Sequence, residues 1–174
     1  MNIFALHEDP DIAARLLYDQ HVRSKMIVES AQMLANCFTS AQLETAPLTQ
    51  RGTPRKHSYF NHPCSKWVRE SFWNMKWLCR HASAMHDERS KRFGSAEPHF
   101  SLTFINWASC NIGKSVVPLV SKTPFAIAIN ENCECRKFPG FDCLDIIEKY
   151  RLYYELDKPY MTRTQPSVDS AVYI

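Results

Sequence analysis

The chain has 174 residues, of which 45% are hydrophobic and 22% charged, and this suits one folded domain over residues 1–174 rather than a disordered chain. Its formal net charge is only +3, and no apolar run approaches the roughly 18 residues of a membrane span. The first residues show no basic region followed by an apolar stretch, which argues against a secretory signal. We therefore expect a soluble, cytoplasmic protein that does not associate with membranes.

The first predicted helix begins at Asp9, which can cap it, with Pro10 at the first helical position and Asp11 near the positive end of the helix dipole. Neither proline nor glycine follows until after Phe38, and apolar residues recur mostly in helical steps. This pattern predicts one bent helix or two consecutive helices. Residues 39–62 contain two prolines and a glycine with little periodicity, and they predict a long loop.

The second predicted helix opens at Asn61, His62 and Pro63 and runs to about Phe93, where Gly94 suits the position after the helix end. One stripe of this helix is expected in the core, and it consists of Trp67, Ser71, Asn74, Leu78, Ala82 and Met85.

The later part of the chain is harder to interpret because prolines interrupt it. Residues 100–107 alternate loosely and fit a strand or a short helix, whereas 142–156 return to helical spacing. The tail from Pro159 is expected to be irregular and carries Tyr160, Arg163 and Tyr173. Only four glycines are present, with no G-x-G-x-x-G or Walker motif, which argues against β-barrels and P-loop enzymes. The sequence thus predicts a mainly α-helical fold with long irregular loops.

Seven cysteines form an odd set, and without an export signal reduced thiols are the default. Cys133, Cys135 and Cys143 offer three soft ligands, which keeps a zinc protein open as an alternative. The one-residue gap between the first two is less typical of zinc sites than a gap of two to four residues, so we expect no metal.

A basic block spans residues 51–92, where ten lysines and arginines face only three acidic residues. Such a block suits a phosphate-rich partner, although a solvated helix face is the alternative. Aromatic rings are interleaved with its charges, namely His57, Tyr59, Phe60, Trp67, Phe72, Trp73 and Trp77.

A first group of chemically capable side chains contains His21, Lys25 and Glu29 at intervals of four residues, which places them on one helix face. Gln32 lies close to the same stripe, and Asp19 can orient His21. A base, a cation and a carboxylate together can activate a nucleophile, hold an anion and move a proton. The alternative is an exposed helix with a single Lys25–Glu29 salt bridge.

A second group lies at the start of the second predicted helix. Backbone amides at a helix N-terminus, together with His62 and Lys66, can make an anion site, and Arg69 and Glu70 follow one turn later. The alternative is a capped helix whose charges are solvated.

The segment Asp19-Gln20-His21-Val22 through Glu29 resembles the first helix of the phage pyrimidine-dimer DNA glycosylase family. Together with Asn61-His62-Pro63 and the following Trp67, Arg69 and Glu70, it also resembles a branch of small phage proteins, the amino acid:DNA transferases of thymidine hypermodification. The resemblance covers about residues 1–95, fades through 95–141 and returns weakly in the C-terminal helix. It implies a compact, mainly α-helical fold and double-stranded DNA as partner.

The transferase branch implies an enzyme that replaces the phosphate of 5-phosphomethyl-deoxyuridine in duplex DNA with an amino acid, for which we expect glycine. The expected catalytic residues are Lys25, His62 and Arg69 for the departing phosphate and Glu29 or His21 as the base. No cofactor is implied, because the substitution changes no oxidation state. Substrate binding is expected from Asp19, Gln32, Asn61, Trp67 and Glu70, and DNA binding from Arg23, Arg51, Arg55, Lys56, His57 and Lys66.

The nucleophile separates this branch from the glycosylase, which uses the α-amine of a small residue exposed after methionine removal. This chain begins Met1-Asn2, and asparagine disfavours that removal, so the expected reaction is transfer rather than lyase chemistry. Two alternatives remain. A DNA glycosylase/AP lyase would use Lys25 or the N-terminal amine, and a non-catalytic helical DNA-binding module would tolerate changes at His21 and Glu29.

Overall fold

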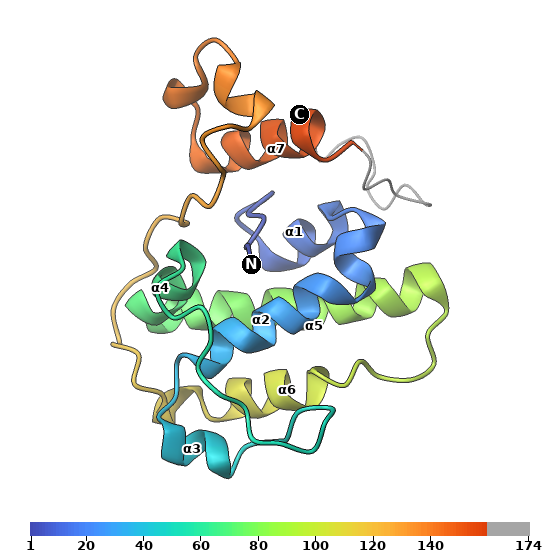
Figure 1. The fold of residues 1–174 in the computed structure, drawn as a ribbon, viewed down its shortest axis with the longest axis vertical. Helices are drawn as coiled ribbons and strands as arrows, with labels where there is room; N and C mark the ends of the chain where they lie inside the picture. The colour runs from blue at the N-terminus through green and yellow to red at the C-terminus, as the bar shows by residue number, and fades with distance from the viewer. Residues whose placement is uncertain (160–174) are drawn as a thin grey trace.

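Helix α5 (Phe72–Phe93) is the longest helix among the described residues, and α1, α2, α4 and α6 all pack against it in the computed structural model (Figure 1). The structure describes residues 1–159, and among these it contains helices but no strand, which confirms the mainly α-helical fold. The remaining α-helices are α1 (Pro10–Leu16), α2 (Met26–Ala35), α3 (Ser40–Glu44), α4 (Pro63–Glu70), α6 (Leu102–Cys110) and α7 (Ile146–Asp157). Short turns are η1 (His21–Lys25, a π-helix), η2 (Ile112–Lys114), η3 (Glu134–Lys137) and η4 (Phe141–Cys143).

The first predicted helical region is divided into three pieces. Asp9 caps α1 as expected, and its carboxylate accepts hydrogen bonds from the amides of Asp11 and Ile12. The chain then becomes extended at Leu17 and resumes as η1 and α2. Arg92 of α5 accounts for this break, because its guanidinium donates to the carbonyl of Leu17 at 2.6 Å and to that of Arg15 at 2.7 Å.

The second predicted helix is also interrupted, at Ser71, so a single helix from 63 to 93 was wrong. Ser71 is extended (φ −152°, ψ 137°), and its hydroxyl donates to the carbonyl of Val120 while accepting from the amide of Trp73. It thereby caps α5. The predicted core stripe is nevertheless buried throughout, and Gly94 ends α5 with a positive φ of 61°.

Two further expectations are resolved by the structure. The predicted loop 39–62 contains the short helix α3, which Thr39 and Gln42 stabilise through a reciprocal capping box, so the loop is shorter than expected. Residues 100–107 are largely helical, as part of α6. The predicted C-terminal helix is confirmed as η4 and α7, while Tyr160, Arg163 and Tyr173 lie outside the described residues.

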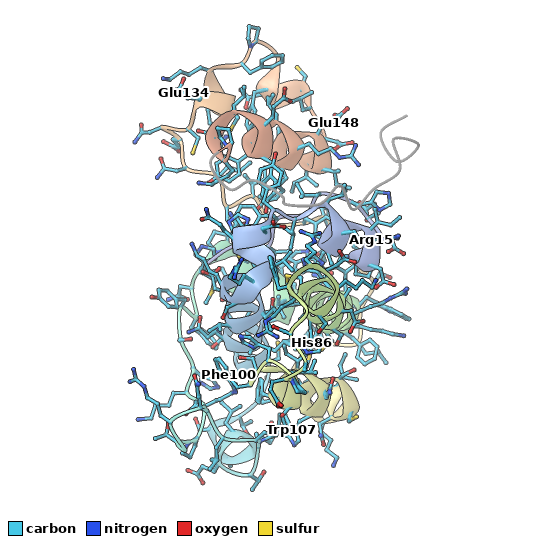
Figure 2. All side chains as sticks on the ribbon, turned by 90° about the vertical axis from the view of Figure 1, so that its right-hand side faces the viewer. Arg15, His86, Phe100, Trp107, Glu134 and Glu148 are labelled. Carbon is cyan, nitrogen blue, oxygen red and sulfur yellow. The ribbon has the colours of Figure 1, made fainter. Side chains whose placement is uncertain are left out.

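Helix α7 and the N-terminal segment lie side by side at one end of the molecule (Figure 1). The side chain of Arg151 on α7 donates to the carbonyl of Leu6 at 3.0 Å, and the Tyr150 hydroxyl donates to the Asn2 side chain at 3.1 Å. Figure 2 shows Glu134 and Glu148 at this end and Trp107 of α6 toward the opposite one. Residues 1–6 are therefore fixed between α7 and the helical body.

All seven cysteines are unpaired thiols, and Cys135 is buried whereas Cys143 is exposed. In the part of the chain that the structure describes, no three histidine, cysteine or acidic side chains are placed to hold a metal ion. Within residues 1–159, no helix combines the length and apolar character needed to cross a membrane.

Candidate active site

A pocket of about 250 Å³ lies where the N-terminal segment meets η1, α2 and α7. It joins segments from both ends of the described chain, since α7 closes the side opposite α2. We call it the Glu29 pocket, and it is lined by Met1, Asn2, Phe4, His21, Lys25, Met26, Glu29, Ala128, Asn130, Tyr153 and Lys158.

Glu29 faces the backbone nitrogens of the first two residues. One carboxylate oxygen lies 3.6 Å from the α-amino nitrogen of Met1, and the other accepts a hydrogen bond from the Asn2 amide at 2.9 Å. Asn2 is itself held, because its side chain donates to the Ala128 carbonyl at 3.0 Å and accepts from the Tyr150 hydroxyl. This network fixes an amine beside a carboxylate inside the pocket.

His21 forms a buried wall of the pocket. Its ring stacks on Phe4 with the centroids 4.4 Å apart, and its Nδ1 is hydrogen-bonded to the Tyr154 hydroxyl. Burial, together with the positive charges of Lys25 and Lys158, lowers the pKa of His21 to about 4. His21 is therefore neutral at pH 7, and it adds no positive charge to the pocket.

Lys25 and Lys158 bring positive charge to the pocket from opposite sides, one from η1 and the other from the end of α7. The Lys158 ammonium lies 4.9 Å from the centre of the Tyr153 ring. Two lysines, one carboxylate and a terminal amine give the pocket a net positive charge, which favours an anionic substrate.

The structure brings together three of the five expected catalytic residues, namely His21, Lys25 and Glu29. His62 caps α4 by accepting from the Cys64 amide, and it does not line the pocket. Burial lowers the pKa of His62, the Met1 amine lowers it further and Glu29 raises it. His62 therefore interacts electrostatically with two charged groups of the pocket although it does not line it.

Arg69 is directed away from the Glu29 pocket. Its guanidinium lies 3.4 Å from the centre of the Phe60 ring and donates to the carbonyls of Phe60 and Ser65. These contacts fold the side chain over the loop before α4. A role for Arg69 in holding a departing phosphate thus requires a rearrangement.

The expected substrate-binding residues do not line the pocket. Asp19 is buried and lies 3.3 Å from the guanidinium of Arg92, and Trp67 is buried with its indole nitrogen donating to the Thr123 carbonyl. Glu70 accepts a hydrogen bond from the Thr123 hydroxyl. Asn61 is exposed and Gln32 is half-buried.

Most of the expected DNA-binding residues are accessible, namely Arg23, Arg51, Lys56, His57 and Lys66. Arg55 differs, because it is only 8% exposed and its guanidinium lies 4.5 Å from the centre of the Phe104 ring. Burial also lowers the pKa of Arg55. Its position is that of a side chain packed against α6, so phosphate contacts are better sought at the exposed residues.

Sequence reasoning did not select several pocket residues, above all Asn2, Phe4, Tyr153 and Lys158. The start of the chain was considered only as a nucleophile for the glycosylase alternative. No spacing in the sequence links residues 1–4 to α7, since that proximity arises from packing. Only the short apolar run at residues 3–6, all buried, marks this segment as part of the core.

An α-helical domain whose pocket sets a carboxylate beside an amine and two lysines has the groups of an enzyme that performs nucleophilic chemistry on an anionic substrate. Residues 1–100 match the family model described as pyrimidine dimer DNA glycosylase. Because the match covers more than half of the chain, the protein belongs to that family, and this indicates glycosylase-like activity on pyrimidines in DNA. No curated protein and no solved structure matches the chain.

The matched residues contribute the N-terminal segment, η1 and α2 to the pocket. Tyr153 and Lys158 lie outside the match, on α7 and just after it. Ala128 and Asn130, which also line the pocket, lie outside the match as well.

Proposed function

We propose that the Glu29 pocket acts on a single pyrimidine nucleotide of duplex DNA, with Glu29 as the base that deprotonates an attacking amine. The family supplies the substrate class, and the 3.6 Å separation of the Met1 amine and Glu29 is the observation that carries the proposal. Chemistry at a base within a duplex requires that the nucleotide be extruded from the stack, at a cost of a few kcal/mol. The positive pocket favours the phosphates that flank such a nucleotide.

The geometry best supports a glycosylase/AP lyase in which the attacking amine is the chain's own. Glu29 accepts a proton from the ammonium, the amine nitrogen attacks C1′ of the deoxyribose, and the pyrimidine leaves with the electron pair of the glycosidic bond. The departing pyrimidine anion takes up one proton of the attacking nitrogen. The C1′–O4′ bond then breaks while O4′ takes up the nitrogen's other proton, and the result is an imine between protein and sugar. This ranks the glycosylase above the amino acid transfer that the sequence favoured, because the structure puts the amine at the carboxylate.

Retention of Met1 does not decide between these reactions. With Met1 in place, its amine lies 3.6 Å from Glu29, and without it the nitrogen of Asn2, 2.9 Å from the same carboxylate, becomes the amine. Both forms therefore present a nucleophile to Glu29. An intact mass of the purified protein identifies the form present.

Amino acid transfer is the second candidate, and the wall that carries Lys158 is what favours it. Lys25 and Lys158 both line the pocket and supply positive charge for a leaving phosphate, and Lys158 comes from outside the family match. In this reaction the amine of a free amino acid, with glycine as the expected donor, attacks the exocyclic methylene of 5-phosphomethyl-uracil. Phosphate leaves, Glu29 accepts the proton of the amine, and no cofactor takes part.

Product analysis on two duplexes tests these proposals. One duplex carries a thymine dimer, and the other carries 5-phosphomethyl-uracil and is incubated with glycine. The glycosylase proposal predicts a broken glycosidic bond and strand cleavage at the dimer. Released phosphate, an intact strand and a base heavier by the glycyl group would instead establish transfer.

A further inference from the structure

A larger hollow of about 510 Å³ lies on the first half of α5, and it shares no lining residue with the Glu29 pocket. We call it the Trp73 groove. Its walls come from α5, from Pro10 at the start of α1, and from the segment around Lys122. The volume falls within the roughly 300–1,000 Å³ of small-molecule sites.

The groove presents one fixed indole and one open indole. Trp77 is buried, and its indole nitrogen donates to the Glu8 carbonyl at 2.7 Å, while its ring packs against Phe125. Trp73 is 47% exposed although it stands one turn before Trp77 on the same helix. A large ring left open beside a packed aromatic cluster offers a surface on which another flat ring can stack.

The charges around these rings are mainly positive. Arg80 is paired with Asp11 at 2.6 Å and Lys122 is paired with Glu8. Lys76 has no acidic partner among the described residues, and its ammonium lies 4.8 Å from the centre of the Trp73 ring. Lys76 is therefore the cation that stands beside the open ring without an acidic partner among the described residues.

We propose that the Trp73 groove binds one unpaired nucleotide of single-stranded DNA, with the base stacked on Trp73 and its phosphate held at Lys76. Stacking on an aromatic side chain is tolerant of base identity, and a cation beside the ring adds the backbone contact. The inference rests on DNA being the partner, as proposed above. It adds a second site, because neither Trp73 nor Lys76 lines the Glu29 pocket.

The test measures binding of a fluorescein-labelled dT8 strand by anisotropy at low salt. Trp73→Leu is expected to weaken binding by about fivefold or more, the lower end of the contribution of one stacked base. Phe138→Leu is the matched control, because Phe138 is also 47% exposed and lies after η3, and it should leave the affinity unchanged. Lys76→Ala should reduce the slope of log affinity against log salt by about 0.7.

Circular dichroism establishes that each variant is folded before binding is compared. Equal affinity of the wild type and Trp73→Leu for dT8 would overturn the proposal. Binding of dTMP as tight as that of dT8, and lost in Trp73→Leu, would also overturn it by assigning the groove to a free nucleotide.

Turnover of the thymine-dimer duplex keeps the two sites distinguishable. Glu29→Gln should lose turnover and keep its affinity for dT8. If Trp73→Leu binds dT8 as tightly as the wild type while turnover still depends on Glu29, the groove proposal fails and the proposed function stands.

Discussion

The Glu29 pocket and the Trp73 groove differ in both size and chemistry. The pocket encloses about 250 Å³ and holds an amine, a carboxylate and a neutral histidine, whereas the groove encloses about 510 Å³ and holds indoles and cations. Residues far apart in sequence build the pocket, while the two tryptophans of the groove come from one helix. The larger hollow is therefore suited to binding, and the smaller one has the groups needed for reaction.

The largest expected effect comes from removing the general base of the Glu29 pocket, a change that leaves the Trp73 groove intact. Glu29→Gln keeps the size of the side chain, and turnover of the DNA substrate should fall by about 10²–10⁴-fold, which is typical of the loss of a general base. Glu44→Gln, at an exposed carboxylate at the end of α3 and outside the pocket, is the control and should retain turnover. Full turnover by Glu29→Gln would show that the pocket is not the reactive region.

The second prediction concerns Arg92, whose contacts hold the chain between α1 and η1 in place. Arg92 is buried, ion-paired with Asp19 and Glu88, and bonded to the Leu17 carbonyl. Arg92→Met removes these ion pairs and the hydrogen bond to Leu17 and should lower the free energy of unfolding by about 3–5 kcal/mol, as seen when one partner of a buried ion pair is removed.

Urea denaturation of the Arg92→Met variant measures this loss. Lys91→Met, at the exposed neighbour on α5, should change the stability by less than about 1 kcal/mol. If Arg92→Met also lowered the free energy of unfolding by less than about 1 kcal/mol, the break after α1 would not depend on the Arg92 contacts.

Acidification should weaken the body of the molecule through His81. Burial lowers the pKa of His81 from its ordinary 6.5 to about 4, so the folded state keeps this ring neutral while the unfolded chain takes up a proton. The stability from this group is complete above pH 6.5 and is lost as the pH falls toward 4. The expected contribution to the slope is about 1.4 kcal/mol per pH unit within this window.

The His81→Asn variant isolates this contribution, because the asparagine amide can still donate to the Pro10 carbonyl that His81 Nδ1 contacts at 2.9 Å. Urea denaturation between pH 7 and 4.5 should show a shallower loss of stability than in the wild type. Identical slopes of stability against pH in the variant and the wild type would contradict the assignment of this loss to His81.

The smallest expected effect concerns exposed charges near the start of α4. Charge reversal by Lys56→Glu together with Lys66→Glu should weaken duplex binding across all sequences. Each lost phosphate contact should reduce the salt slope by about 0.9. Lys137→Glu, on the remote turn η3, is the control, and an unchanged salt slope in the double variant would remove these two lysines from the DNA surface.

Local signals in the sequence predicted local structure well. The caps at Asp9 and Gly94 and the buried stripe from Trp67 to Met85 follow from short-range rules, and the structure has them. The sequence allowed for two consecutive helices in the first region but did not place the break at Leu17, and it did not predict the break at Ser71. Each break depends on a distant partner, Arg92 in one case and the Val120 carbonyl in the other.

The same distinction applies to the candidate site. The spacing of His21, Lys25 and Glu29 placed three side chains that do share the pocket, although the π-helix η1 departs from the regular helix assumed. Lys158 and Met1 line the same pocket as Glu29, where α7 packs on the N-terminal segment. Spacing along one helix could not show that contact.

The central claim is that an amine of the chain, activated by Glu29, attacks the deoxyribose. Incubation with dimer-containing duplex and sodium borohydride, followed by peptide mass spectrometry, tests it directly, because reduction converts the imine into a stable protein–DNA adduct. We predict an adduct on the N-terminal peptide of the wild-type protein and none with Glu29→Gln. Base release without any adduct, or an adduct on Lys25 instead, would contradict the claim.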